Sequence, residues 1–354
     1  MELTKATRIV IAAGGTAGHV VPALAVAAEL QARGVEVIFV GGQRAELELV
    51  PAAGFELRQI RVEGISRTNP LKAIRAVARS AAAVLAARSI LAELRPAAVM
   101  GGGGYVAGPV GAAAAMMGIP VVLTEADSHL GLTNRLLAHL AAKVCLAFPI
   151  KGRSAPRYLV TGRPGPPIAT DREAARARFD LLEGETCVLV FGGSLGARSI
   201  NEAAVVAFGD APFRVLHVTG SSGFASTLSP RLGYDVREYL EQFGEALLAA
   251  DLVVARSGGS VFEIAAYGRP ALLIPYPQAA GDHQAANAAW MADAGAAVVI
   301  ADSELTAPLL ARTVGELLDS PSRLAGMAKS SRHLARPQAA HDVAGEIIAA
   351  ANKR

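Results

Sequence analysis

A strand followed by a glycine loop and a helix occurs twice in this chain, and this repeat constrains the fold more than any other feature. The segment IVIAAGGTAGHVVPA, which begins at Ile9, resembles CVLVFGGSLGARSIN, which begins at Cys187, and Gly15 and Gly193 lie 178 residues apart. The repeat predicts two similar α/β domains in tandem.

Uninterrupted apolar runs surround both loops, as is typical of strands that are buried on both faces of a parallel sheet. We therefore expect two doubly wound, Rossmann-like domains, with a ligand cleft between them at the carboxyl ends of the strands. The Pro- and Gly-rich stretch VTGRPGPPIATD is the expected hinge. The expected domains are residues 1–161 and 162–337, followed by a helical tail. The expected strands are RIVIAAGG, VEVIFVGG, AAVMGGGG, IPVVLTE and AKVCLAF in the first domain, and CVLVFGG, FRVLHVTG, DLVVARSGG, PALLIPYP and AAVVI in the second.

Positive charge is local. The chain carries a formal net charge of +3, and the segment Arg61–Arg95 alone holds seven Lys or Arg against two Glu. Aromatic residues make up only 5% of the chain. A general nucleic-acid binder is therefore not expected. The two cysteines, Cys145 and Cys187, provide neither a disulfide framework nor a cysteine metal site, which fits a reducing cytoplasm.

No membrane span or leader is expected. The 29 residues from Pro96 to Thr124 carry no charge, but ten of them are Gly or Pro. Broken backbone is poorly tolerated in lipid, so a strand, a glycine loop, a helix and a second strand fit this segment better. The N-terminal apolar run is interrupted by a Gly pair and His19, which argues against a signal peptide.

Both glycine loops have the pattern GGxxG before a helix. Glycine lets backbone N–H groups approach an anion closely, and a helix N-terminus adds partial positive charge. Neither loop has the GK[ST] of a phosphate-binding loop or a clean GxGxxG with an acidic ribose ligand. One loop alone could be a packing turn, but two loops at equivalent positions indicate a diphosphate ligand.

His19 follows the first loop directly, at the start of a helix. Most single histidines are structural. At the mouth of a cleft, however, a neutral imidazole can accept a proton from an attacking hydroxyl.

The segment RSGGSVFE, which begins at Arg256, predicts a further glycine turn at a helix start, with Ser257 and Gly258 in the turn. Glu263 is either a partner of the helix dipole or a ligand of a ribose diol. Gln284 and Asn287 fall on one helix face, where side-chain amides suit sugar hydroxyls. A metal cage would need more carboxylates, so no metal is expected.

Lys72, Arg75 and Arg79 fall within about 60° of one another on a helical wheel. They form either the solvated face of a crossover helix or a surface for peripheral attachment to an anionic cytoplasmic leaflet.

Together these motifs resemble the bacterial MurG family of undecaprenyl-diphospho-muramoylpentapeptide β-N-acetylglucosaminyltransferases, within glycosyltransferase family 28. The matching pieces span nearly the whole chain: GGTAGHVVPALAVA, GGGGYVAGPVG, GLTNRLLA, GGSLGARSIN, RSGGSVFEIAAYGRPALLIPYP and DHQAAN. The resemblance implies the GT-B fold. It also implies inverting transfer of GlcNAc from UDP-GlcNAc to the 4-hydroxyl of lipid I, making lipid II for peptidoglycan at the cytoplasmic membrane face. No cofactor or catalytic metal is implied.

The resemblance assigns roles residue by residue. The C-terminal domain would hold the donor, with Glu263 on the ribose and Gln284 on the GlcNAc hydroxyls; the N-terminal domain would meet the acceptor, and the helix 338–354 would pack back on it. The implied catalytic residues are His19 and Glu125; the implied donor-binding residues are Gly193, Ser194, Arg198, Ser257, Gly258, Glu263, Gln284 and Asn287; the implied acceptor or diphosphate residues are Thr16, Ala17, Gly18, Gly103, Tyr105, Asn134 and Arg163.

Three departures from the family pattern concern cleft positions. Ala17 replaces the glycine of GGTGGH, and Asp127 stands where members have the asparagine of E-x-N. The hinge motif GNPVR is Gly162–Pro166 here, read GRPGP. Its arginine is lost, and we expect Arg163, three positions earlier, to compensate.

Other functions remain open from the sequence. One is a GT-B transferase that glycosylates diacylglycerol or another polyprenyl carrier, which the departures would favour. Another is a UDP-GlcNAc 2-epimerase, and a third is a non-catalytic nucleotide-sugar binder. The products formed from UDP-GlcNAc alone would separate these.

Overall fold

The computed structural model describes residues 7–61, 70–221, 223–228 and 231–353, and the side chains of residues 70–80, 227 and 280 lie outside that description. The chain divides into unit 1 (Met1–Pro167 with Arg336–Arg354) and unit 2 (Ile168–Ala335). The boundaries therefore lie at Pro167 and Arg336 rather than at the expected 161 and 338. The first hinge residues stay with unit 1 because Gly162 packs against the Arg336 side chain and Arg163 donates to the carbonyl of Gly18.

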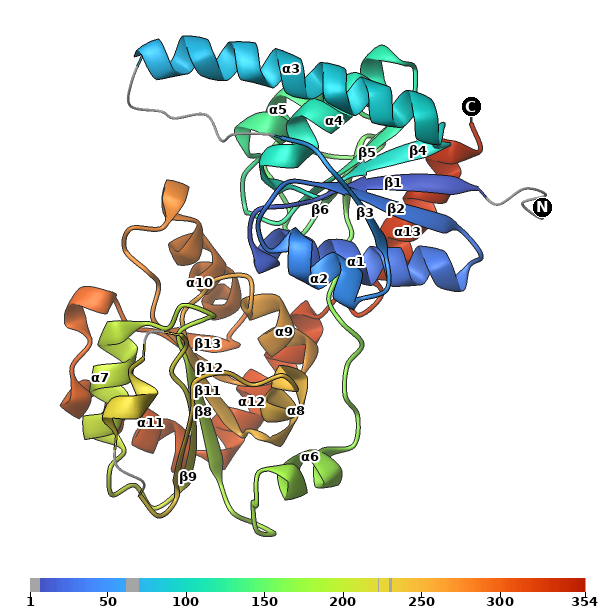
Figure 1. Cartoon of the computed structure of the whole chain (residues 1–354). Helices are drawn as coiled ribbons and strands as arrows, with labels where there is room; N and C mark the ends of the chain where they lie inside the picture. The colour runs from blue at the N-terminus through green and yellow to red at the C-terminus, as the bar shows by residue number, and fades with distance from the viewer. Residues whose placement is uncertain (1–6, 62–69, 222, 229–230, 354) are drawn as a thin grey trace. The chain divides into compact units, whose positions relative to one another are not determined.

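Unit 1 is built on a seven-stranded parallel sheet in the order β3-β2-β1-β4-β5-β6-β7 (Figure 1). The central strand β4 is fully buried, and β1 is buried from Ile9 onward, as their apolar sequences require. The strands are β1 (Arg8–Ala12), β2 (Glu36–Gly41), β3 (Glu56–Gln59), β4 (Ala98–Gly101), β5 (Val121–Glu125), β6 (Lys143–Leu146) and β7 (Tyr158–Val160).

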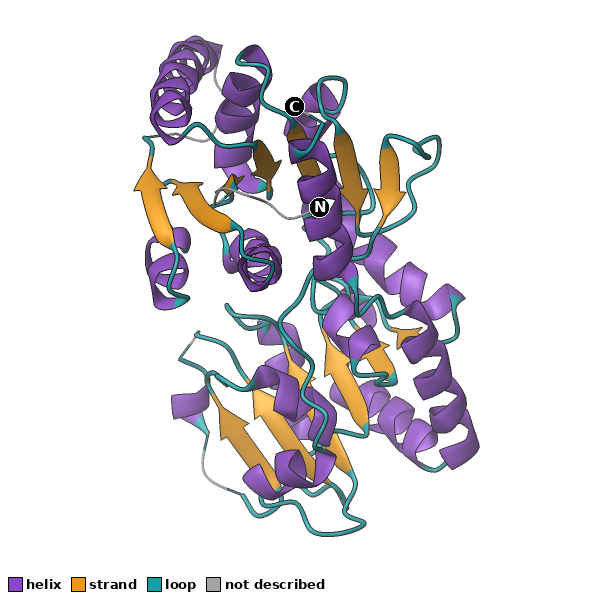
Figure 2. Cartoon of the chain, turned by 90° about the vertical axis from the view of Figure 1, so that its right-hand side faces the viewer, coloured by secondary structure: helices purple, strands orange, loops and turns teal. Residues whose placement is uncertain are grey.

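Helices cover both faces of this sheet (Figure 2). The last helix of the chain belongs to unit 1, because Val343, Ala344 and Ile347 are fully buried in the same core as Ile9 and Ile11. The first face carries α1 (Ala17–Ala32), α2 (Glu46–Ala52) and α13 (Ala339–Ala351), and the second carries α3 (Pro70–Leu94), α4 (Gly104–Met116) and α5 (Leu132–Leu137).

Unit 2 is built on a six-stranded parallel sheet in the order β10-β9-β8-β11-β12-β13. Its central strands are also fully buried. The strands are β8 (Cys187–Phe191), β9 (Arg214–Val218), β10 (Tyr234–Arg237), β11 (Leu252–Ala255), β12 (Ala271–Leu273) and β13 (Ala297–Val299).

The helices of unit 2 also form two layers (Figure 2), and α7 and α11 share one core with the sheet. The α-helices are α6 (Arg172–Arg178), α7 (Arg198–Ala207), α8 (Phe243–Ala249), α9 (Val261–Ala266), α10 (His283–Asp293), α11 (Ala307–Leu318) and α12 (Pro321–Leu334). Short 3-10 turns are η1 (Ala225–Thr227), η2 (Ala280–Asp282) and η3 (Asp302–Glu304).

Both sheets have the same topology, which is the dinucleotide-fold order 3-2-1-4-5 from one edge. The strand order reverses between β1 and β4 in unit 1 and between β8 and β11 in unit 2. Ligands of such sheets bind beside the carboxyl ends of these strands. Each GGxxG loop follows the first strand of its unit, so both loops lie at the predicted switch points.

All ten expected strands are confirmed, but β3, β7 and β10 were missed. Each lies at an edge of its sheet, so it pairs on one side alone. β3 reads ELRQ and has no fully buried residue, so no apolar run marks it. The uncharged segment forms β4, α4 and β5 as expected, and no helix among the described residues is long and apolar enough to span a bilayer.

Unit 2 contains a buried polar network around His217 on β9. Its Nδ1 lies 2.9 Å from the Tyr234 hydroxyl and its Nε2 lies 3.1 Å from Oδ1 of Asn201. Burial lowers the pKa of His217 to about 4. The imidazole is therefore neutral in the folded unit at neutral pH.

This network predicts a pH-dependent stability of unit 2. Between pH 6.5 and pH 4 the unfolded chain binds a proton that folded His217 does not, so stability falls as the pH falls. From pH 7 to pH 5 we expect a loss of about 2 kcal/mol from this residue. Urea unfolding followed by the fluorescence of Trp290, the single tryptophan and part of α10, reports unit 2.

In His217→Gln the loss of unfolding free energy between pH 7 and pH 5 should be smaller. The control is His139→Gln, because His139 is exposed and lies in unit 1, and this variant should show the full loss. An equal drop between pH 7 and pH 5 in both variants would contradict the assignment.

Candidate functional site

Two glycine loops meet at the switch point of unit 1. A Cβ on Gly104 would lie 1.8 Å from the carbonyl oxygen of Gly14, so the loop after β4 packs backbone to backbone on the loop after β1. A Cβ on Gly103 would lie 2.6 Å from Cδ2 of His19. The first loop, Gly103 and His19 thus come together, as the sequence suggested.

His19 is half-buried in the first turn of α1, and its Nδ1 lies 3.2 Å from Oγ1 of Thr16. Burial lowers the pKa of His19, the positive charge of Arg163 lowers it further, and Asp127 opposes them. The imidazole is therefore neutral at neutral pH, which is the form that accepts a proton.

Arg163 lies against the first loop, where its Nη2 donates to the carbonyl of Gly18 at 2.7 Å. The hinge arginine is thus held beside His19 rather than in solvent. Ala17 is the first residue of α1, and a helical backbone suits alanine, which explains why this departure from GGTGGH is tolerated.

Glu125 ends β5 and is buried. Its carboxylate accepts hydrogen bonds from the Gly131 N–H at 2.8 Å, from Nδ2 of Asn134 at 3.0 Å and from the Asp127 N–H at 3.2 Å. Burial raises the pKa of Glu125, and these hydrogen bonds act against burial. Asn134 also donates to the Thr124 carbonyl, so Glu125 and Asn134 together hold the loop between β5 and α5.

Sequence reasoning missed Glu46, the first residue of α2, which has no exposed surface. Its carboxylate accepts from the N–H groups of Gly15 and Gly42, both at 2.8 Å, and from the Tyr105 hydroxyl at 2.9 Å. Burial alone would raise the pKa of Glu46, but the hydrogen bonds, first that of Gly15, lower it. Tyr105, an expected acceptor residue, therefore uses its hydroxyl within unit 1.

The GGxxG loop of unit 2, which follows β8, is open to solvent. Gly193 and Ser194 are exposed, and the Ser194 carbonyl accepts the Ser221 N–H at 3.1 Å. Arg198, expected to contribute positive charge to this loop, is instead exposed and donates to Glu202 at 2.7 Å along α7. The i,i+4 spacing on one helix favours that pair, and the role of Arg198 at the loop stays a prediction.

The RSGG turn and α10 form the second part of the unit 2 site. The Ser257 hydroxyl donates to the Gln284 carbonyl at 2.7 Å, and Nδ2 of Asn287 donates to the Ser257 carbonyl at 2.9 Å. Gln284 is half-buried, and its Oε1 accepts the Tyr276 N–H. Asn287 is 2% exposed, so it supports the turn from beneath rather than presenting an amide to a sugar.

Glu263 is half-buried in the first turn of α9, directly after this turn. Arg256, which opens the segment, is 8% exposed and was not assigned a role from the sequence. Its guanidinium donates to Asp302 at 2.6 Å, to the Ser199 hydroxyl at 2.9 Å and to the Ile274 carbonyl at 3.1 Å. It therefore ties the ends of β11 and β12 to α7.

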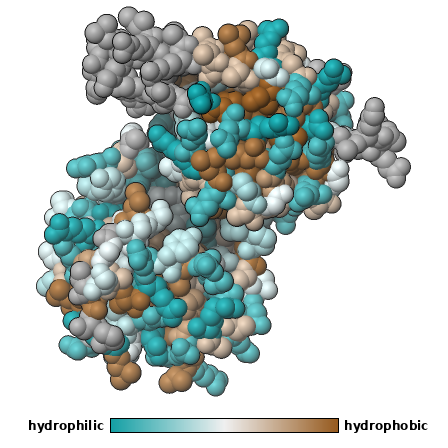
Figure 3. Space-filling view, viewed as in Figure 1, coloured by the Kyte–Doolittle hydropathy of each residue, from teal (hydrophilic) through white to brown (hydrophobic). Residues whose placement is uncertain are grey.

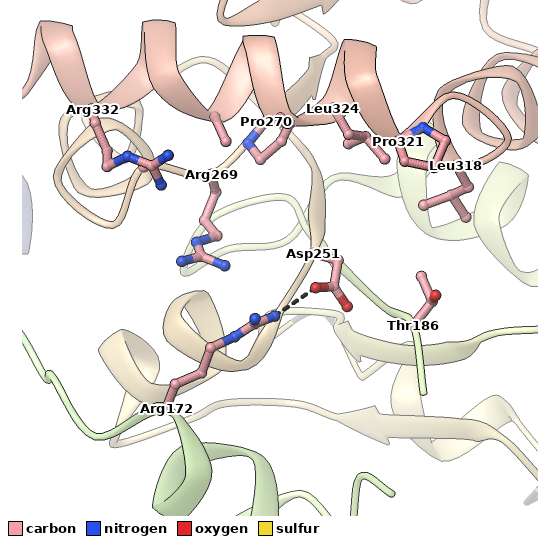
Figure 4. A pocket seen from close by; sticks show the side chains of 12 residues that line it. Arg172, Thr186, Asp251, Arg269, Pro270, Leu318, Pro321, Leu324 and Arg332 are labelled. Carbon is pink, nitrogen blue, oxygen red and sulfur yellow. Dashed lines mark hydrogen bonds and ion pairs between the residues drawn. The ribbon is translucent and has the colours of Figure 1, made fainter. Parts of the chain in front are cut away.

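A cavity of about 400 Å³ opens at the amino ends of strands β8, β11 and β12 in unit 2, away from the glycine loops (Figure 4). Arg172 donates to Asp251 at 2.5 Å and to the Leu248 carbonyl, and Arg269 donates to the Ala250 carbonyl at 2.7 Å. These arginines satisfy carbonyl groups at the C-terminal end of α8, which is a structural role. Because Asp251 precedes β11, this cavity is separate from the glycine loops.

The side chains of Lys72, Arg75 and Arg79 lie outside the described residues, although α3 spans their positions. In the part of the chain that is described, no group of three His, Cys, Asp or Glu side chains could hold a metal ion.

Comparison with known protein families identifies both halves of the chain. The glycosyltransferase family 28 N-terminal domain matches residues 9–146, and the family 28 C-terminal domain matches residues 187–343. The first match covers β1 to β6 of unit 1, and the second covers the whole sheet of unit 2.

Curated relatives match over nearly the whole chain. The UDP-N-acetylglucosamine–N-acetylmuramyl-(pentapeptide) pyrophosphoryl-undecaprenol N-acetylglucosamine transferase of Moorella thermoacetica is 40% identical, over 96% of this chain and 98% of the relative. The enzyme of the same name from Pseudomonas entomophila is also 40% identical, over 95% of both chains.

Solved structures agree with these matches. MurG of Acinetobacter baumannii aligns with a TM-score of 0.77 at 32% identity, over 97% of this chain and 99% of that one. A UDP-GlcNAc 2-epimerase from Neisseria meningitidis aligns over 97% of this chain with a TM-score of 0.66 but only 14% identity, which shows a shared fold alone.

The contact of Arg163 with the first loop predicts a measurable effect on His19. Arg163→Ala removes a positive charge that disfavours imidazolium, so the pKa of His19 should rise. Titration of the His19 ring signals by NMR measures this. Arg58→Gln, which removes a positive charge elsewhere in unit 1, should leave the His19 signals unchanged; an unchanged pKa in Arg163→Ala would place Arg163 away from the ring.

Proposed function

The chain belongs to glycosyltransferase family 28, and we propose that it transfers N-acetylglucosamine from UDP-GlcNAc to the 4-hydroxyl of undecaprenyl-diphospho-N-acetylmuramoyl-pentapeptide, making lipid II for peptidoglycan. The observation that carries this function is the 40% identity, across both units, to relatives that bear its name. The chain is thus a UDP-GlcNAc-dependent N-acetylglucosaminyltransferase of the GT-B fold.

We assign the donor to unit 2. The exposed loop at Gly193 and Ser194 supplies N–H groups to the UDP diphosphate, and Glu263 accepts hydrogen bonds from the ribose diol. Gln284 contacts the GlcNAc hydroxyls. Ser257, Gly258 and the buried Asn287 shape the turn that carries these groups.

We assign the acceptor to unit 1. His19 accepts the proton of the 4-hydroxyl as that oxygen attacks the anomeric carbon, while UDP departs with the bonding electrons. Its lowered pKa keeps it in the required neutral form. Arg163 and the loop from Thr16 to Gly18 face the acceptor diphosphate, and Glu125 with Asn134 holds the neighbouring loop. This scheme uses no metal.

The alternative functions have weaker support. The likeness to 2-epimerases stands at 14–16% identity and concerns the fold. Transfer to diacylglycerol or another carrier rests on the departures at Ala17, Asp127 and the hinge. Ala17 is accommodated as the first residue of α1, the Asp127 N–H donates to Glu125, and Arg163 lies at the first loop.

The acceptor is a membrane lipid, so we propose peripheral attachment of unit 1 to the anionic cytoplasmic leaflet. Leu132 and Leu136 of α5 and Leu140 just after it, which we together call the α5 leucines, are 51%, 65% and 65% exposed and lie four residues apart. Arg135 lies among them and is exposed. Hydrophobic side chains do reach the surface of unit 1 among hydrophilic ones (Figure 3). Apolar and basic groups side by side suit a bilayer surface.

UDP release tests the function most simply. UDP should form from UDP-GlcNAc only when a lipid I analogue is present, with lipid II as the second product. Conversion of UDP-GlcNAc without any acceptor would indicate an epimerase, and transfer to diacylglycerol would indicate another lipid acceptor.

Glu263→Ala should weaken UDP-GlcNAc binding, because a charge-assisted hydrogen bond to the ligand is lost. The expected cost is about 1.5–3 kcal/mol, or about 10- to 150-fold in Kd. Calorimetry with UDP-GlcNAc measures it. Glu304→Ala removes an exposed carboxylate of the same unit and should bind normally. Unchanged affinity in a stably folded Glu263→Ala would refute the ribose assignment.

Replacement of the α5 leucines by serine should reduce binding to phosphatidylglycerol vesicles and leave UDP-GlcNAc affinity unchanged. Replacement of Lys72, Arg75 and Arg79 by glutamine should lower vesicle binding by up to about 100-fold at low salt, since each cation contributes about 1 kcal/mol. That loss should fade at high salt.

Leu182→Ser provides the control, because Leu182 is 71% exposed but lies in unit 2. Vesicle binding that is insensitive to both sets of changes would contradict the membrane assignment.

A further inference from the structure

A single buried carboxylate joins three segments at the switch point of unit 1. Oε2 of Glu46 accepts the Gly15 N–H of the loop after β1, and Oε1 accepts the Gly42 N–H after β2. Oε1 also accepts the hydroxyl of Tyr105, which sits in the first turn of α4. Tyr105 in turn accepts the Gln43 N–H at 3.2 Å. Glu46 therefore connects the loops that follow two neighbouring strands with the helix that follows a third.

The surrounding glycines leave room for this arrangement. A Cβ on Gly14 would lie 2.8 Å from Oε1 of Glu46, and a Cβ on Gly41 would lie 2.8 Å from its Cγ. A Cβ on Gly42 would lie 1.9 Å from the Tyr105 hydroxyl. The glycine pairs after β1 and β2 thus serve to admit a side chain of this protein as well as a ligand.

The consequence for the first loop is direct. The Gly15 N–H, which a bare glycine loop would offer to an anion, is already bonded to a carboxylate. Thr16 follows immediately, and its hydroxyl lies 3.2 Å from the His19 ring. The position of Gly15 therefore determines where Thr16 and His19 stand.

We propose that Glu46 is a positioning residue for the transfer, which fixes the first loop so that Thr16 and His19 meet the acceptor hydroxyl. Glu46 itself does not touch either substrate. The inference rests on the proposed function for its kinetic part, while the tether itself is a property of unit 1 alone.

Only a carboxylate serves all three donors. A glutamine has one acceptor oxygen and one NH₂ group, which accepts nothing. Whichever way the amide of Glu46→Gln turns, either the Gly15 or the Gly42 N–H faces a donor and loses its acceptor. The shape of the side chain is kept, so the variant tests the hydrogen bonds rather than the packing.

The first measurement is steady-state transfer from UDP-GlcNAc to a lipid I analogue. In Glu46→Gln we expect kcat/KM for the acceptor to fall about 10- to 100-fold, because small misplacements of catalytic groups cost this much. The Kd for UDP-GlcNAc should not change. The matched control is Glu48→Gln, since Glu48 is exposed on the same helix and should behave as the wild type.

The second measurement separates positioning from general damage. If Glu46 acts through His19, then Glu46→Gln should lower the rate little further in a His19→Ala background. Independent losses that multiply, a wild-type rate in Glu46→Gln, or an equally weakened donor affinity would each overturn the proposal.

Hydrogen exchange tests the tether without any substrate. Peptides that contain Gly15 and Gly42 should exchange faster in Glu46→Gln and remain protected in Glu48→Gln. Tyr105→Phe removes one of the three bonds and should produce a smaller effect, which keeps the test valid if Glu46→Gln folds poorly. Unchanged exchange overturns the tether, whereas a wild type that is inactive on lipid I refutes the proposed function and leaves the exchange result standing.

Discussion

A parallel sheet that is covered by helices on both faces leaves only the ends of its strands free to bind a ligand. This constraint organises the whole chain. In both units the strand order reverses beside the first strand, and the loop after that strand is a glycine loop. Side chains that touch a ligand must therefore come from the segments after β1, β4, β5 and β7 in unit 1, and after β8, β11 and β12 in unit 2. The cavity at the amino ends of the unit 2 strands has a structural role instead, since its arginines donate to carbonyl groups at the end of α8.

The carboxyl ends of the two sheets differ in a way that suits two substrates. In unit 2 they carry an exposed, glycine-rich loop and a turn supported from below by Asn287, which suits a nucleotide sugar. In unit 1 the loops there are held by internal hydrogen bonds, to Glu46 in the first loop and to Glu125 in the loop after β5. It presents a neutral imidazole at His19, beside a guanidinium. This difference supports the proposed assignment of donor binding to unit 2 and proton transfer to unit 1.

Much of this could be predicted from the sequence, because apolar runs and glycine loops report directly on buried parallel strands and their switch points. The edge strand β3 was missed because it reads ELRQ and carries no apolar run. The Glu46 contacts were missed because they join positions that lie 31 and 59 residues apart, and no local pattern encodes them. Arg198 was expected at the glycine loop and begins α7, whereas Asn287 was placed on a helix, as α10 confirms. The sequence could not show that one pairs with Glu202 and the other is buried.

The division of labour between the units is tested most directly by His19→Ala, measured with saturating UDP-GlcNAc and lipid I analogue alongside the donor Kd. A positioned general base contributes about 10²–10⁴-fold, so kcat should fall by that factor while the Kd for UDP-GlcNAc stays at the wild-type value. A wild-type kcat, or a loss of donor affinity that matches the loss of rate, would contradict the account.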